Sequence, residues 1–252
     1  MNNIKGSFKL FIIFIFFSNY LASEYPNRIL FVGNSYLYYN DSMHNHVERL
    51  LIEHYRDDDI VTKSATIGGS KLHNHNIDHL LNHENLQLDK QVDLLIMQGG
   101  STEVTTPELR AQFSETAVKF SNKAHRLGIK TALYMTHAYL ENDKRYEPNL
   151  IEKIKKAYYE AGMRSDSLVI PVGLAYEIAY QEKPKIKLHH PDGTHPGLLG
   201  TYLGACTVFA IITNSSPEGL SYNYLNKISD EDRLFLQKIA QKAYLKNKYL
   251  FK

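Results

Sequence analysis

Three polar side chains in this sequence have the types that nucleophilic acyl transfer needs. Ser35 follows an apolar run and the pair Gly33-Asn34, and Asp192 lies three residues before His195 in a segment rich in turn-forming residues. This chemistry uses a hydroxyl nucleophile, a base that takes its proton and a group that orients the base. A carboxylate can keep one imidazole nitrogen protonated while the other nitrogen faces the serine. Each segment alone is also typical of a surface turn, so the hypothesis of a Ser35–His195–Asp192 triad depends on the two segments meeting.

The apolar run before the serine predicts a strand that ends at the site. Residues 30–32 are Leu, Phe and Val without polar alternation, which is typical of a strand buried on both faces of a parallel sheet. Gly33 permits a tight exit from that strand. Ser35 would then lie at the carboxyl end of the first strand, where open α/β sheets bind their ligands. Asn40-Asp41 offers an N-cap for the helix that follows.

The rest of the chain alternates predicted strands and helices. The clearest helix is capped by Thr106, has Pro107 at its first position and is stopped by Gly128. Its apolar residues recur at spacings of three and four and form one expected buried face: Leu109, Phe113, Ala117, Phe120, Ala124 and Leu127. Further strands are predicted at 60–65, 92–97, 129–135 and 168–172, and further helices at about 148–161, at 198–212 and after Ser229. Five strands separated by helices indicate a parallel sheet covered on both faces.

The first 23 residues have the pattern of a secretory signal peptide. Lys5 and Lys9 precede an apolar run at 10–17, and polar residues and the small pair Ala22-Ser23 follow it. The apolar run is shorter than the ~20 residues that a membrane-spanning helix needs. The sequence therefore predicts a secreted or periplasmic protein with a signal peptide at 1–23, one domain at 24–252 and no stable membrane span after cleavage. An uncleaved N-terminal anchor is the alternative.

Composition narrows the class of protein. A formal net charge of +2 over 252 residues, with basic residues scattered along the chain, does not indicate a nucleic-acid partner. The single cysteine, Cys206, excludes an internal disulfide and a cysteine-rich zinc site, and its apolar surroundings predict a buried structural thiol.

Four short blocks occur in the order that resembles the SGNH, or GDSL-like, serine hydrolases. That family has Gly-Asp/Asn-Ser after the first strand, a glycine after the second, a side-chain donor after the third and Asp-x-x-His near the C-terminus. The corresponding blocks here are Gly33-Asn34-Ser35, Gly68-Gly69, Gln98-Gly99-Gly100-Ser101 and Asp192-Gly193-Thr194-His195. The resemblance implies an α/β class protein with a flavodoxin-like, three-layer α/β/α sandwich around a five-stranded parallel sheet.

The resemblance also implies an oxyanion hole, and here the sequence departs from the family pattern. The usual Gly-x-Asn-Asp third block is absent, and its asparagine position falls near Ser101. Sialate acetylesterase-like members carry Gln-Gly-Glu instead, which Gln98-Gly99-Gly100 partly resembles. We expect the donors to be the backbone N–H groups of Ser35 and Gly69 and the side chain of Gln98, because an amide is a better donor than the Ser101 hydroxyl. The alternative for Gln98 is a strand-end residue bonded to neighbouring backbone.

Other residues near the first and second strands suggest weaker hypotheses. If the chain is helical from Asn76 onward, His75, His79 and His83 share one face, but they span about 12 Å of rise and no carboxylate completes a zinc site. We therefore expect no metal and no cofactor. The tyrosines just after the nucleophile could line a sugar or acyl pocket, or pack beneath a helix; they are Tyr36, Tyr38 and Tyr39.

Three functions are consistent with these residues. The leading hypothesis is an exported serine esterase that acts on a small-molecule or glycan ester through an acyl-enzyme, with O-acetyl groups on carbohydrate as one candidate substrate. An acyltransferase would use the same triad with a sugar hydroxyl in place of water. A non-catalytic binding protein on the same fold is the third hypothesis, and the presence of all three triad residues disfavours it.

Overall fold

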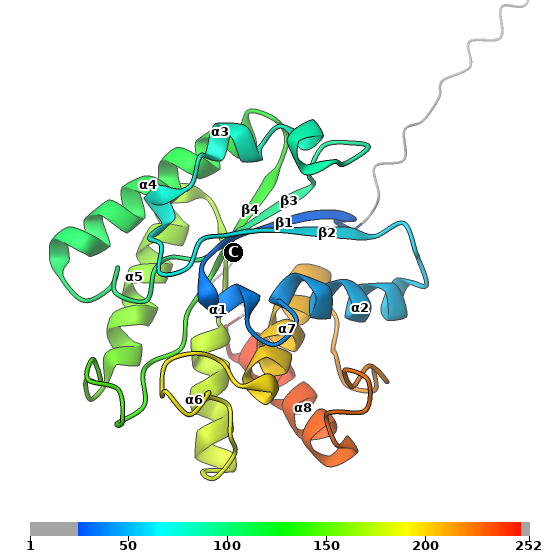
Figure 1. Ribbon diagram of the computed structural model, residues 1–252, viewed down its shortest axis with the longest axis vertical. Helices are drawn as coiled ribbons and strands as arrows, with labels where there is room; N and C mark the ends of the chain where they lie inside the picture. Colours follow the sequence, from blue (N-terminus) through cyan, green and yellow to red (C-terminus); the bar gives the residue numbers. More distant parts are fainter. Residues whose placement is uncertain (1–24, 248–252) are drawn as a thin grey trace, which may run out of the picture.

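A five-stranded parallel sheet forms the centre of the molecule in the computed structural model, which describes residues 25–247 (Figure 1). The strand order is β2-β1-β3-β4-β5, and every neighbouring pair is parallel. The strands are β1 Arg28–Gly33, β2 Val61–Thr66, β3 Leu94–Met97, β4 Lys130–Tyr134 and β5 Leu168–Ile170. Each overlaps one of the predicted runs, so the prediction of an α/β fold with five parallel strands is confirmed.

Helices cover both faces of the sheet, which gives three layers. One face packs against α2 (Met43–Tyr55), α6 (Val172–Glu182), α7 (Leu198–Thr213) and α8 (Asp230–Asn247). The other face packs against α3 (Ile77–Leu80), α4 (Pro107–His125) and α5 (Leu150–Ser165). A short helix, α1 (Ser35–Tyr38), follows β1 directly.

The central strand explains why its sequence is apolar without alternation. Successive side chains of a strand point to opposite faces of a sheet. In β1, Ile29 and Phe31 lie in the core on the α7 side, whereas Leu30 and Val32 lie in the core on the α4 side. Both faces of the strand are therefore buried, and both sets of side chains must be apolar.

Helix α7 is the most deeply buried helix and contains the single cysteine. Its residues from Gly200 to Ile211 are all buried. Cys206 is a free, buried thiol, as the sequence predicts, and burial raises its pKa to about 12. Since the reactive form of cysteine is the thiolate, this residue is chemically inert at neutral pH.

One helix start and two helices differ from the sequence prediction. The N-cap expected at Asn40-Asp41 is wrong, because residues 40–42 have positive φ angles and α2 begins only after Ser42. The Asn40 side chain instead donates hydrogen bonds to the Pro196 carbonyl (2.9 Å) and the Thr201 hydroxyl (2.8 Å). It thus connects the segment after Ser35 to the start of α7. Helices α1 and α6 were not predicted, because α1 is a single turn and α6 follows β5 almost without a loop.

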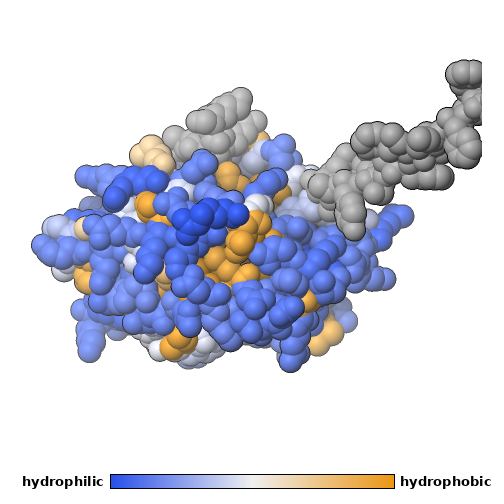
Figure 2. Space-filling view, turned by 90° about the horizontal axis from the view of Figure 1, so that it is seen from above, coloured by the Kyte–Doolittle hydropathy of each residue, from blue (hydrophilic) through white to orange (hydrophobic). Residues whose placement is uncertain are grey.

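The predicted signal peptide at 1–23 lies outside the described residues. No helix within residues 25–247 is long and apolar enough to cross a membrane. Figure 2 shows one face of the molecule, which is hydrophilic over most of its area and has hydrophobic side chains gathered near its centre.

Replacing Phe113 tests the buried face of α4. Phe113 is fully buried between α4 and the sheet, so Phe113→Ala is expected to lower the free energy of unfolding by about 3–5 kcal/mol through lost burial and a cavity. Leu127, predicted on the same face, lies beyond the end of the helix and is 51% exposed. Leu127→Ala is therefore expected to change the free energy of unfolding by less than about 0.5 kcal/mol. Urea unfolding of both variants measures the difference, and equal effects would contradict this account of α4.

Candidate active site

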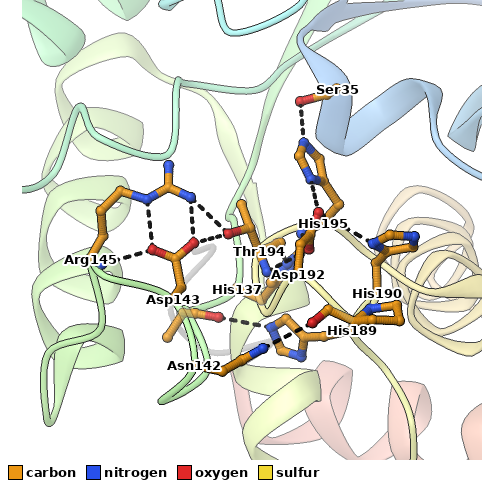
Figure 3. A network of polar contacts seen from close by, with 12 residues as sticks. Ser35, His137, Asn142, Asp143, Arg145, His189, His190, Asp192, Thr194 and His195 are labelled. Atoms are coloured by element: carbon orange, nitrogen blue, oxygen red, sulfur yellow. Dashed lines mark hydrogen bonds and ion pairs between the residues drawn. The ribbon is translucent and has the colours of Figure 1, made fainter.

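The structure brings Ser35, His195 and Asp192 into one hydrogen-bonded line. The Ser35 Oγ lies 2.9 Å from the His195 Nε2, although the two residues are 160 positions apart in the chain. The His195 Nδ1 lies 2.7 Å from the Asp192 Oδ2 on the opposite side of the ring. Figure 3 shows the hydroxyl, the imidazole and the carboxylate pointing toward one another in that order. This is the contact order that a serine nucleophile, a general base and an orienting carboxylate require.

The end of β1 holds Ser35 through the backbone and the Asn34 side chain. The Asn34 Oδ1 accepts a hydrogen bond from the Tyr36 N–H (3.1 Å) and so caps α1, while its Nδ2 donates to the Ser70 carbonyl (2.9 Å). A Cβ at Gly33 would lie 2.6 Å from the Gln98 Oε1, so the tight packing here requires a glycine. Ser35 is therefore presented from a rigid turn between β1 and α1.

Asp192 organises its own loop as well as the histidine. Its Oδ1 accepts hydrogen bonds from the backbone N–H groups of Thr194 (2.9 Å) and His195 (3.0 Å), while its Oδ2 faces the imidazole. Burial alone would raise the pKa of Asp192, but the hydrogen bonds from the His195 ring and the two N–H groups together hold it well below its usual range. Asp192 is therefore ionised at neutral pH and can stabilise a protonated His195.

The chain after β4 provides the support beneath this loop. The Leu140 N–H donates to the Gly193 carbonyl (2.9 Å), and the Asn142 Nδ2 donates to the Pro191 carbonyl (2.9 Å). Figure 3 shows that the segment carrying Asn142 lies directly beside the loop carrying Asp192. We call residues 137–145 the support loop and residues 189–196 the histidine loop.

An ion pair in the support loop also contacts the histidine loop. The Arg145 guanidinium binds both carboxylate oxygens of Asp143, and its Nη2 donates to the Thr194 Oγ1 (2.7 Å). The Thr194 hydroxyl in turn donates to Asp143. Hydrogen bonds from Arg145 hold the pKa of Asp143 well below its usual range, so the pair remains ionic at neutral pH. Thr194, the residue before His195, is thus fixed through its side chain.

Aromatic rings surround the imidazole. The Tyr39 ring stacks on His195 with 4.2 Å between centroids, and Tyr36 meets the same imidazole edge-on at 5.8 Å. Tyr36 is buried and stacks on His137. Of the two interpretations of the tyrosines, packing in the interior therefore applies to Tyr36. Tyr38 is 44% exposed and stacks loosely on Tyr39. Of the three tyrosines after Ser35, Tyr38 and Tyr39 are therefore the ones that are not buried.

The expected oxyanion donors have different surroundings. Neither the Ser35 N–H nor the Gly69 N–H donates a hydrogen bond to another described residue, so both are available to a ligand. Gln98 is only 1% exposed; its Oε1 accepts from the Asn34 N–H (3.0 Å), and its Nε2 donates to the Gly99 carbonyl. Both contacts of the Gln98 side chain are thus to neighbouring backbone, as expected if Gln98 is a strand-end residue with a structural role. The oxyanion role of Gln98 stays a prediction.

The histidine series near the second strand does not form one helical face. Helix α3 ends at Leu80, and a separate 3₁₀ turn begins at His83. His75 is buried, and its Nε2 lies 3.2 Å from the Ser70 Oγ. Within residues 25–247 no group of three or more histidine, cysteine or acidic side chains is placed to hold a metal ion.

Sequence reasoning missed the support loop and a second histidine beside the carboxylate. The His190 Nδ1 lies 3.3 Å from the same Asp192 oxygen that faces His195. The support loop follows a predicted strand whose carboxyl end meets the same edge of the sheet as Ser35, so its polar residues could have been proposed for the site. No comparable pattern in the sequence singles out His190.

Comparisons with known proteins support the fold. No protein-family model matches the sequence, and a search of curated proteins finds no match. Among solved structures, a DUF4886 family protein from Bacteroides uniformis superposes with a TM-score of 0.69 at 19% identity, covering 89% of this chain and 96% of that one.

Two further solved structures are similar over about three quarters of this chain. A candidate SGNH hydrolase from Slackia heliotrinireducens has a TM-score of 0.60 at 20% identity and covers 74% of this chain and 98% of that one. The acetyl xylan esterase AlAXEase has a TM-score of 0.56 at 18% identity, and the match covers 73% of this chain and 99% of that one. The chain therefore has the three-layer fold of the SGNH and GDSL-like hydrolases.

Proposed function

We propose that this protein is an SGNH-type serine esterase that hydrolyses its substrate through an acyl-enzyme on Ser35. The observation that carries the proposal is the continuous line from the Ser35 Oγ through His195 to Asp192, with spacings of 2.9 and 2.7 Å. The solved structures with this fold include esterases, which supports hydrolysis of an ester bond. A non-catalytic binding protein would not need this arrangement.

The mechanism follows from which atoms the hydrogen bonds join. The Ser35 oxygen attacks the ester carbonyl carbon while its proton passes to the His195 Nε2. Asp192 accepts the hydrogen bond from the opposite ring nitrogen and stabilises the imidazolium. His195 then protonates the departing alcohol, which leaves an acyl group on Ser35. Water attacks this acyl group with His195 as base, the acid is released and the serine regains its proton.

The oxyanion would be stabilised by N–H groups at the ends of β1 and β2. The Ser35 and Gly69 N–H groups have no partner among the described residues, and Gly69 has a positive φ of 68° in an exposed turn. We include Gln98 as the third donor, which requires its amide to rotate away from the Gly99 carbonyl that it now contacts. Preorganised donors of this kind stabilise the charge that develops on the carbonyl oxygen.

The substrate we propose is an O-acetylated carbohydrate outside the cell. An acetyl xylan esterase is among the solved structures with this fold, and the exposed Tyr38 ring beside the nucleophile offers a surface on which a sugar could stack. The signal-peptide pattern at 1–23 supports export. Release of acetate from an acetylated xylan, and acetyl transfer to an added glycan, would separate the esterase from the acyltransferase alternative.

Replacing the nucleophile tests the covalent step. Ser35→Ala is expected to abolish labelling by a fluorophosphonate probe and to reduce p-nitrophenyl acetate hydrolysis to background, because no other group supplies the attacking oxygen. Ser216→Ala, at an exposed serine after α7, is the matched control and is expected to react like the parent. Labelling of Ser35→Ala at the parent rate would refute the proposed nucleophile.

Replacing the carboxylate tests the role of Asp192. In Asp192→Asn the amide nitrogen would face the His195 Nδ1, which favours the ring tautomer whose Nε2 carries the proton and cannot accept one from Ser35. We expect kcat to fall by about 10⁴-fold, the loss typical when a triad carboxylate becomes an amide. Asp230→Asn, at an exposed carboxylate in α8, should leave kcat unchanged. A kcat for Asp192→Asn within the error of the parent value would show that Asp192 does not orient the base.

Replacing Gln98 distinguishes its two interpretations. If its amide stabilises the oxyanion, Gln98→Ala is expected to lower kcat by about 10²–10³-fold. Ser101→Ala is expected to have a smaller effect, because the hydroxyl is the weaker donor. A lower melting temperature for Gln98→Ala with an unchanged kcat for the folded enzyme would instead assign Gln98 a purely structural role, through its bond to Asn34.

A further inference from the structure

His137 lies between the histidine loop and residues 33–36 around the proposed nucleophile, which we call the nucleophile turn. It comes three residues after β4, so it sits at the same carboxyl edge of the sheet as Ser35, and it is only 2% exposed. Its ring stacks on the Tyr36 ring (4.7 Å between centroids, 7° between planes) and on the Tyr176 ring (4.4 Å, 3°). Tyr36 immediately follows the nucleophile, so one face of the imidazole is in contact with the chain that carries Ser35.

The polar edge of the same imidazole contacts the chain that carries the catalytic base. The His137 Nε2 lies 2.8 Å from the Thr194 carbonyl oxygen. A carbonyl oxygen only accepts hydrogen bonds, so Nε2 must carry the proton and the tautomer of His137 is fixed. The Nδ1 has no hydrogen-bond partner among the described residues. Burial lowers the pKa of His137 well below its ordinary value, which is consistent with a neutral ring that donates through one nitrogen.

The Thr194 carbonyl belongs to the peptide group that also contains the His195 N–H. That N–H donates to the Asp192 Oδ1 at 3.0 Å, while the carbonyl oxygen accepts from His137. The two hydrogen bonds act on opposite ends of one planar peptide group and fix its orientation. Because the His195 side chain leaves the backbone at this peptide, the orientation of the peptide sets where the imidazole meets Ser35.

We propose that His137 is a positioning residue that aligns His195 with Ser35 through the Thr194–His195 peptide. The proposal rests on the proposed esterase function, since it concerns the geometry of the same triad. His137 itself touches neither the serine oxygen nor a substrate; it acts through Tyr36 on one side and the Thr194 carbonyl on the other. Loss of the Nε2–H donor would let the peptide rotate and lengthen the Ser35–His195 contact.

Two replacements separate the donor from the ring. His137→Phe keeps a flat ring for stacking but has no donor, whereas His137→Gln loses the ring and can place an amide N–H where Nε2 now lies. We expect His137→Phe to slow fluorophosphonate labelling of Ser35 by about 10–100-fold, the loss typical of a catalytic group displaced by about 1 Å. The kcat for p-nitrophenyl acetate should fall by a similar factor while KM stays unchanged, and His137→Gln should recover most of the lost rate.

The control is the same replacement at His125, the last residue of α4, whose ring contacts the opposite end of β4. His125→Phe removes a histidine that contacts the Thr131 hydroxyl, and it is expected to label at the parent rate. If His137→Phe does not fold, His137→Met replaces it, because methionine matches glutamine in length and cannot donate. The proposal is overturned if His137→Phe, or His137→Met in its place, is labelled at the parent rate. It is also overturned if that variant and His137→Gln are labelled at the same reduced rate. If the fluorophosphonate does not label Ser35 in the parent protein, the proposed esterase function is wrong. This outcome is distinct from a failure of the His137 proposal, which requires a labelled parent.

Discussion

The contact between the support loop and the histidine loop is the constraint on which the site depends. Ser35 is fixed by a tight turn between two regular elements, but His195 comes from a loop without regular structure. That loop is held by hydrogen bonds from residues 137–145, among them Leu140 to Gly193 and Asn142 to Pro191. Together with the bond from Asn40 to the Pro196 carbonyl and the stacking of Tyr39 on His195, these bonds hold the imidazole 2.9 Å from a serine 160 residues away.

The sheet topology makes this contact available. All five strands are parallel, so every strand ends at the same edge, and β1 and β4 are separated only by β3. The support loop leaves β4 and the nucleophile turn leaves β1, which places both at the edge where the start of α7 also lies. Asn40 closes the arrangement by bonding to the Pro196 carbonyl and the Thr201 hydroxyl. The triad is thus assembled by short connections around one sheet edge, the usual location of function in open α/β folds.

The sequence predicted the parts of this structure that depend on local pattern. Buried strands appear as apolar runs, and the cap and proline at the start of α4 are visible as Thr106 and Pro107. The Ser35, Asp192 and His195 blocks could be found because each has a characteristic composition. Contacts between side chains that are distant in the sequence have no such local pattern. Nothing local shows that Asn40 binds the start of α7 rather than capping α2, or that the Gln98 amide is bonded to backbone at both ends.

Burial gives the histidines around this site different chemistry. An imidazole enclosed by protein is held neutral, because desolvation disfavours its charged form, and it can serve only as a hydrogen-bond donor and acceptor. His137 and His189 are in this position, and burial lowers the pKa of both.

His195 differs because its side chain is partly exposed and faces an ionised carboxylate. In the proposed mechanism, a proton from Ser35 would create a charge on this ring that Asp192 compensates directly. His137, which is buried and bonded to the Thr194 carbonyl, is held neutral and adds no competing charge. In the proposed role, His137 would therefore orient His195 without disturbing the proposed proton transfer, which a lysine or arginine at the same position could not do.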